Sequence, residues 1–406
     1  MFLESMFEKR NGTSLSDPPN WLVNMLGGQQ TSSGEKVSAD TALSHADVFA
    51  CVQVLADDVA KLPVRVFRES EGKIEKRTKH PVSKLLYKEP NIYMTAFTWK
   101  KLVMTHLCLQ GNSYSYIVKD RKGDVVGLIP LHPTRTHPRI DPQTGKFWYE
   151  TVINGKYREL LPDEVLHYKG MSDDGIVGKS PITVIREQIG AQSAATKYNS
   201  RFYANDATPN GILKVPTQLK PDAKEQVREE WEKVNSSEDI AVVDAGLDYE
   251  SVSMNMEDAQ FIESMKFNKL QIANIFKIPP HKVNDLDGGT FNNVESQSID
   301  YLMGTIQPWV TAIEQENDVK LFTESESNKG LYTKFNTGAM LRTDSKSRAE
   351  YYQIMLEKGI YSLNEVRELE EMNRIDNGDE HRVDLNHISL SIADDYQMSK
   401  AGGSKG

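Results

Sequence analysis

Apolar residues recur at a helical spacing in several separate stretches of the chain. Between Ser44 and Leu62 they fall at every third or fourth position, which is the period of an amphipathic helix, and Pro63 ends the stretch. The segment from Thr95 to Leu109 has a similar pattern. The same spacing predicts further helices over Ser180–Asn205, Glu257–Phe276 and Ser296–Asn317, and helical segments over Asp344–Met372 around a turn at Gly359.

The stretch from Gly111 to Tyr168 has the pattern of β-strands instead. Its short apolar runs, such as NSYSYIV and KFWYETVI, are separated by turns rich in Gly, Asp and Pro. No helical pattern interrupts them, so we expect a meander and not a parallel sheet with crossover helices. Short strands are also expected at Val64–Phe67 and Tyr332–Phe335. The chain is therefore predicted to have an α+β fold.

A small acidic unit separates the first two of the long helices. Residues 206–255 combine the strand pattern NGILKV, the charged helix KPDAKEQVREEWEKV and two further strands. Between Lys220 and Glu250 there are ten acidic and four basic residues, a net charge of −6. The surface is either a solvated helix face or a docking surface for a basic partner. The candidate docking residues are Glu225, Glu229, Glu230, Glu232, Glu238 and Asp239.

Composition narrows the class of protein. Of the 406 residues, 38% are apolar and 26% are charged, which is ordinary for a folded soluble protein. We find no run of about 18 apolar residues that would span a membrane, and no apolar N-terminal stretch that would direct secretion. Cys51 and Cys108 lie in apolar surroundings and are expected to be buried free thiols. A net charge of −10 argues against a surface that grips DNA phosphates tightly.

Gly178-Lys179-Ser180 has the GK[ST] ending of a nucleotide-binding loop, and the run IAVVD further on has the form of a strand with a metal-binding Asp. However, Asp173 stands where such a loop requires its first Gly, and its carboxylate would repel phosphate. Ser180 followed by Pro181 is instead typical of a helix start, with Ser as the N-cap. We therefore expect a helix start and not an ATPase site.

Other chemical motifs are incomplete. A calcium loop beginning at Asp285 would need Gly at Thr290 and Glu at Ser296, so a loop of turn residues is favoured. There is no HExxH, CxxC or GxSxG motif, and the nine histidines are scattered. The sequence predicts no catalytic residues, no metal site and no cofactor, and hence a protein that is not an enzyme.

Six stretches, taken in order, resemble the portal proteins of tailed bacteriophages of the HK97 type. The resemblance covers about residues 40–380, and it makes GKSP similar to the G-x-SP helix entrance of that family. The stretches are ADVFACVQVLADDVAKLPVRVF, GNSYSYIV with LIPLHPTRTHPRID, VLHYKGMSDDGIVGKSPI, RFYANDATPNGILKV, DAQFIESMKFNKLQIANIFKIPPHKV and MLRTDSKSRAEYYQIMLEKGIYSLNEVRELEEMNRIDNGD.

The resemblance implies a portal fold assembled as a ring of about twelve copies at one capsid vertex. Double-stranded DNA would pass through its channel during packaging and ejection, without sequence specificity. Implied partners are the terminase large subunit, a head–tail adaptor, the major capsid protein and scaffold, but no membrane. The protein would reside in the virion, and in the host cytoplasm during assembly.

The resemblance also implies a division of the chain. The parts are an N-terminal arm (1–40), a wing (41–180), a first stem helix (181–205), a clip (206–255), a second stem helix (256–278), a tunnel loop (279–295), a wing helix with a returning strand (296–343), a short helical crown (344–380) and a tail (381–406). The tunnel-loop residues expected to face DNA are Asn284, Asp285, Asp287, Gly288, Gly289, Thr290, Asn292 and Asn293.

Two lysines of the second stem helix have a spacing that suits a channel. Lys266 and Lys269 lie three residues apart and therefore on neighbouring faces. Repeated around a ring, they would form sparse basic belts that centre a duplex. Alternatively, they face solvent or pair with Glu263, the third candidate on this helix. Two rivals to the portal interpretation stay open, a nucleotide-driven enzyme and an acidic ring-forming scaffold that does not handle DNA.

Overall fold

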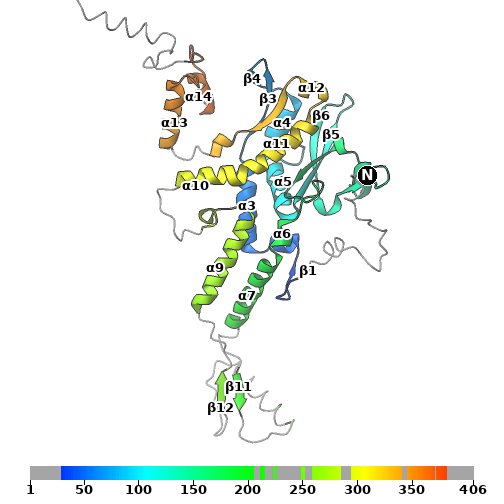
Figure 1. The fold of residues 1–406 in the computed structure, drawn as a ribbon, viewed down its shortest axis with the longest axis vertical. Coiled ribbons are helices and arrows are strands. Elements are labelled where there is room, and N and C mark those ends of the chain that lie inside the picture. The colour runs from blue at the N-terminus through cyan, green and yellow to red at the C-terminus, as the bar shows by residue number, and fades with distance from the viewer. Residues whose placement is uncertain are drawn as a thin grey trace, which may run out of the picture.

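The computed structural model describes residues 29–204, 211–214, 222, 225, 248–251, 258–284, 294–340, 345–370 and 372–381. Within these ranges the chain forms a body of helices and small sheets, from which two long helices project (Figure 1). The main apolar core lies in the body and joins residues from Val37 to Phe335. The α+β class predicted from the sequence is confirmed.

Two helices form the centre of the body. α3 (Ala46–Ala60) packs on α5 (Ala96–Gln110), and both lie close to their predicted positions. Thr95 caps α5 by accepting a hydrogen bond from the Thr98 amide, and Gly111 ends it in a left-handed conformation. The short helices α2 (Ala39–Ala42) and α4 (Pro81–Tyr87) were not predicted.

Three antiparallel sheets complete the body. The predicted single meander is wrong, because β10 returns to pair with β5 instead of continuing from β9. Successive side chains of β10 point to opposite faces of the sheet, so this strand has to lie between two apolar clusters. Leu166 and Tyr168 join the main core, and Val165 joins a second cluster with Tyr114 and Tyr149. The sheets are β13-β3-β4 (Leu331–Phe335, Val64–Ser70, Lys73–Lys76), β10-β5-β6 (Val165–Lys169, Asn112–Lys119, Val125–Leu131) and β7-β8-β9 (His137–Ile140, Phe147–Ile153, Lys156–Leu160).

The first projecting helix is interrupted near its start. The chain forms α6 (Pro181–Val184) and then α7 (Arg186–Ala204), because Ile185 leaves helical geometry (φ −98°, ψ 16°) with its side chain buried in the core. The prediction of one unbroken helix is therefore wrong at this point. α9 (Asp258–Ile275) agrees closely with its prediction and contacts α7. Two short hairpins accompany the helices, β1 (Gln29–Gln30) with β2 (Lys36–Val37), and β11 (Gly211–Lys214) with β12 (Asp248–Ser251).

The third long helix contains a π-helical segment. α10 (Val294–Tyr301) continues through η5 (Leu302–Ile306), which is π-helical, into α11 (Gln307–Leu321), and the short α12 (Glu324–Asn328) follows. Pro308 lacks the amide that would continue the α-helical bonding, and the π segment precedes it. The sequence predicted the helix but not this change of winding.

A helical hairpin follows the body. α13 (Ser345–Glu357) and α14 (Leu363–Leu369) are joined across Gly359, which has a positive φ of 67°, as the predicted turn requires. Lys76 of β4 pairs with Glu368 of α14 at 3.2 Å. Short 3₁₀ turns complete the described structure at η1 (Pro133–Arg135), η2 (Pro162–Glu164), η3 (Pro280–Val283) and η6 (Thr337–Met340).

Candidate functional site: the projecting helices and the segments that join them

The two projecting helices lie side by side and extend away from the body, α7 starting at the body and α9 returning to it beside α3 (Figure 1). The hairpin of β11 and β12 lies beyond their far ends. The order along the chain, helix, small unit, helix, is the order predicted for a stem and its insert. The assignment of these parts to a stem and a clip stays a prediction.

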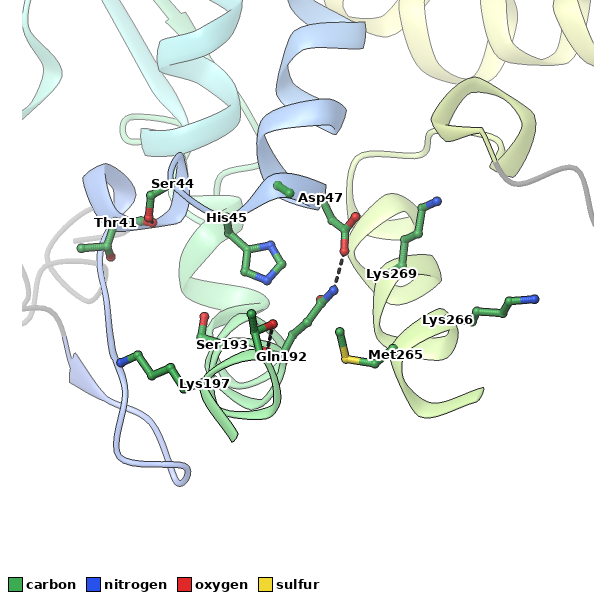
Figure 2. A pocket seen from close by; sticks show the side chains of 12 residues that line it. Thr41, Ser44, His45, Asp47, Gln192, Ser193, Lys197, Met265, Lys266 and Lys269 are labelled. Atoms are coloured by element: carbon green, nitrogen blue, oxygen red, sulfur yellow. Dashed lines mark hydrogen bonds between the residues drawn. The ribbon is translucent and has the colours of Figure 1, made fainter. Parts of the chain in front are cut away.

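The three candidates on α9 are accessible to different degrees. Glu263 and Lys266 are exposed, and Lys269 is half-buried. Figure 2 shows Lys266 and Lys269 projecting from α9 on the side away from α7. The structure therefore brings both amines to one side of the helix pair, where a row of charges repeated around a ring would lie. Their contact with DNA stays a prediction.

Of the predicted tunnel loop, only the beginning is described. Asn284 ends η3 in a left-handed conformation with a φ of 59°. The remaining candidates lie outside the described residues: Asp285, Asp287, Gly288, Gly289, Thr290, Asn292 and Asn293.

A buried carboxylate holds the described start of this loop. Asp58 of α3 is 6% exposed, and its Oδ2 lies 3.5 Å from the Lys282 amine, which belongs to the first residues of the loop. Lys282 lies in turn 5.0 Å above the ring of Tyr301, which follows the loop on α10. Asp58 also pairs with Lys61 at 2.5 Å. The sequence analysis missed Asp58, although a carboxylate on the apolar face of a predicted helix is a signal that could have found it.

Of the acidic docking candidates, the structure describes one. Glu225 lies in a helical turn and is exposed. The other five candidates lie outside the described residues: Glu229, Glu230, Glu232, Glu238 and Asp239.

The backbone amides from Gly175 to Lys179, which a bound phosphate would need, are already hydrogen-bonded within the protein. The Asn112 side chain holds Gly178 through two hydrogen bonds of 2.7 Å, one to its amide and one to its carbonyl. Lys179 pairs with Asp173, the residue at the position where a phosphate loop needs Gly. Ser180 is the N-cap of α6 as predicted, but its hydroxyl donates to the Leu109 carbonyl at 2.5 Å instead of capping the helix. Gly178 and Lys179 pack closely against the backbone of Gly111, which lies between α5 and β5.

We also searched the part of the chain that the structure describes for a metal site, a membrane-spanning helix and reactive thiols. No group of three or more His, Cys, Asp or Glu side chains there could hold a metal ion. None of the described helices is both long and apolar enough to cross a membrane. Cys51 and Cys108 are buried free thiols, as predicted, and burial raises the pKa of each to about 12.

An elongated α+β body with a projecting helix pair is a fold shared with the subunits of viral portals. The chain belongs to the phage portal protein family, whose family model matches residues 46–371. It is 32% identical over 379 residues to the probable portal protein of Streptomyces phage phiC31, covering 88% of this chain and 82% of the relative. It is 28% identical over 352 residues to the portal protein of Enterobacteria phage HK97, covering 84% and 82%.

Solved structures agree on the fold. An HK97 family phage portal protein from Corynebacterium diphtheriae superimposes with a TM-score of 0.58 at 17% identity, covering 79% of this chain and 99% of that one. A chain from the neck of a native gene transfer agent particle, computed with C12 symmetry, gives a TM-score of 0.54 at 19% identity and covers 82% and 92%. The family resemblance found in the sequence is confirmed.

Proposed function

We propose that this chain forms a ring of about twelve subunits around a channel for double-stranded DNA at one capsid vertex. The observation that carries the proposal is the family match over residues 46–371, which spans the body, both projecting helices and the helical hairpin. The number of subunits rests on the likeness to a neck particle described with C12 symmetry.

Within this ring, the parts take the roles that their order suggests. Residues 181–205 and 256–278 form the stem, residues 206–255 the clip, residues 279–295 the tunnel loop and residues 344–380 the crown. Residues 41–180 and 296–343 form the wing. The exposed positions of Glu263 and Lys266 on α9 support contact with whatever passes through the channel, and the net charge of −10 favours weak contact that lets a duplex move.

The partners follow from these positions. The acidic clip binds the terminase large subunit during packaging and a head–tail adaptor afterwards. The wing contacts the major capsid protein and scaffold. The ring assembles in the host cytoplasm and stays in the virion.

The role is non-enzymatic in this proposal. The way Asn112 closes the GKS segment supports this, because a phosphate-binding loop needs free backbone amides. The same observation weighs against the rival interpretation as a nucleotide-driven enzyme.

The test is imaging of the purified protein by negative-stain electron microscopy, with a parallel determination of the mass of the assembly. We expect rings with a central hole wide enough for a duplex, and no ATP turnover. A monomer that hydrolyses ATP would overturn the proposal in favour of the enzyme. Rings that support capsid assembly but never DNA packaging would favour the acidic scaffold.

A further inference from the structure

The hairpin of α13 and α14 has no apolar core of its own in the described part of the chain. Figure 1 shows the two helices side by side, at the end of the molecule opposite β11 and β12. Across residues 345–370 and 372–381 the buried residues are Ser362, Asn364 and Gly378, and none of the apolar side chains that the structure describes there is buried. Helices this short are stable in proteins mainly through the packing of an apolar face. The hairpin therefore needs a cover.

Polar contacts join the two helices instead. The Tyr352 hydroxyl donates to Glu370 Oε1 at 2.8 Å, and Arg348 lies 3.6 Å from the same carboxylate. The Asn364 side chain holds the segment after α14, because it donates to the Ile375 carbonyl at 2.9 Å and accepts from the Ile375 amide at 2.8 Å. These bonds fix the shape of the hairpin and leave its apolar side chains at the surface.

The exposed apolar side chains are large and lie close to one another. Tyr351 and Ile354 are three residues apart on α13 and share one side of the helix, and the Tyr351 ring meets the Tyr361 ring at 6.4 Å. Single exposed apolar residues are ordinary, but a group of them on a small unit indicates a binding surface. We call the group the apolar face; its members are 41% to 56% exposed and are Tyr351, Ile354, Ile360, Leu363, Met372 and Ile375.

The last described residue lies beside this apolar face. His381 Nδ1 is 3.1 Å from the carbonyl oxygen of Gly359, the neighbour of Ile360. Three residues earlier, the Gly378 carbonyl accepts from the amide of Asn364, the neighbour of Leu363. The segment that follows His381 therefore starts at the apolar face, although residues 382–406 themselves lie outside the described residues.

The sequence after His381 has a pattern that suits this face. Ile388, Leu390 and Ile392 alternate with two serines, and an extended segment places such alternate residues on one side. Ile388 comes seven residues after His381, and seven extended residues span up to about 23 Å. The 13 residues of α13 are only about 20 Å long. The apolar segment can thus reach any part of the face.

We propose that residues 388–392 of the same chain bind to the apolar face of the α13–α14 hairpin. Ile388, Leu390 and Ile392 pack on the face and supply the apolar cover that the hairpin lacks, while Ser389 and Ser391 face solvent. This contact belongs to a single chain. It goes beyond the proposed function and does not depend on the ring.

A photochemical cross-linker tests the occupant directly. A diazirine-bearing side chain replaces Ile360 in the full chain, and the irradiated protein is analysed on a denaturing gel and by mass spectrometry of its peptides. We expect a product that runs as a monomer, in which position 360 is joined to residues 388–392. The same cross-linker at Gln353, which is exposed on the opposite side of α13 from Tyr351, is the control and should give few such links.

The other outcomes overturn the proposal. Irradiated protein without links from position 360 to residues 388–392 would show that this segment does not cover the face. Links that produce covalent dimers would show that another copy of the chain covers it. Neither result bears on the ring, since the proposed function is tested by imaging of the unmodified protein.

Paired substitutions provide the second measurement. Ile388→Asp with Leu390→Asp places two charges against the apolar face, and we expect the amides of α13 and α14 to exchange with deuterium roughly tenfold faster or more. Ser389→Asp with Ser391→Asp adds the same charge at the intervening positions and should leave exchange unchanged. The amides of α3 report whether the body stays folded in both variants. Equal exchange of the hairpin in the two variants would contradict the proposal.

Discussion

His167 sits on β10 between the two apolar clusters and is 3% exposed. Its Nε2 lies 3.0 Å from Asn112 Oδ1, and its Nδ1 lies 3.2 Å from the Tyr149 hydroxyl. A neutral imidazole satisfies both contacts, because Nε2–H donates to Asn112 and Nδ1 accepts from Tyr149. Asn112 in turn holds Gly178, so the Asn112 side chain supports the junction between β5 and the start of α6.

This burial makes the stability of the fold depend on pH. Desolvation lowers the pKa of His167 to about 3, so the unfolded chain binds a proton that the folded chain refuses. Stability is therefore complete above about pH 6.5 and decreases towards pH 3, by up to about 1.4 kcal/mol per pH unit. Urea unfolding at pH 7 and pH 5.5 should show this loss, and His167→Gln should reduce it.

A second histidine sharpens the test. Burial, and to a lesser degree the nearby His132, lowers the pKa of His106 to about 4, so His106→Gln should remove a further part of the slope. If His167→Gln keeps the full dependence on pH, the neutral hydrogen-bonding role assigned to His167 is wrong.

At the scale of elements, the sequence predicted the long helices well because their apolar period is set by one continuous core. α3, α5 and α9 begin and end within a few residues of the predicted limits. It failed where tertiary packing decides. The break at Ile185 and the π segment at Leu302–Ile306 leave the apolar period nearly intact, so the pattern does not reveal them.

The candidate site residues divide in the same way, into those that a local sequence pattern reveals and those that only tertiary packing brings together. Lys266 and Lys269 could be named because a helical spacing places them on neighbouring faces. The link between Asp58 and Lys282 joins residues 224 positions apart, and no local pattern brings them together. The hydrogen bond from Gln192 of α7 to Asp47 of α3 joins residues 145 positions apart in the same way and needed the three-dimensional structure.

The junction between α5 and β5 depends on one glycine. Gly111 has a φ of 70°, and a Cβ there would lie 2.1 Å from the Lys179 carbonyl oxygen. We expect Gly111→Ala to lower the free energy of unfolding by about 3 kcal/mol or more, from backbone strain and from separation of the packed segments. Urea denaturation of the purified protein measures the change.

Gly155 is the matched control. Its φ of 75° is nearly the same, but nothing lies within 4 Å of the position that a Cβ would take. Gly155→Ala should therefore cost only about 1 kcal/mol, the conformational part of the effect. Equal losses in the two variants would show that the contact between Gly111 and the GKS segment contributes little.

On the scale of the whole molecule, charge and assembly act together. The chain has a net charge of −10, so the ring that we propose would be strongly acidic and would hold DNA only through local contacts. A channel through which a duplex slides benefits from this, since each tight phosphate contact slows its movement. The tunnel loop expected from the sequence follows the same rule, with Asp285 and Asp287 among Gly and Asn residues.

Reversing those two charges should therefore slow DNA movement. We expect the double variant Asp285→Lys with Asp287→Lys to package DNA severalfold more slowly in a reconstituted system of empty capsids and motor, because each subunit gains two cations that bind phosphate. The slowing should weaken as salt rises, since screening and counterion release reduce such contacts. Glu71→Lys with Glu159→Lys makes the same change in net charge at exposed positions of the body and should package normally. An unchanged rate in the loop variant would mean that these residues do not meet DNA, and the channel contacts would then have to be sought on α9.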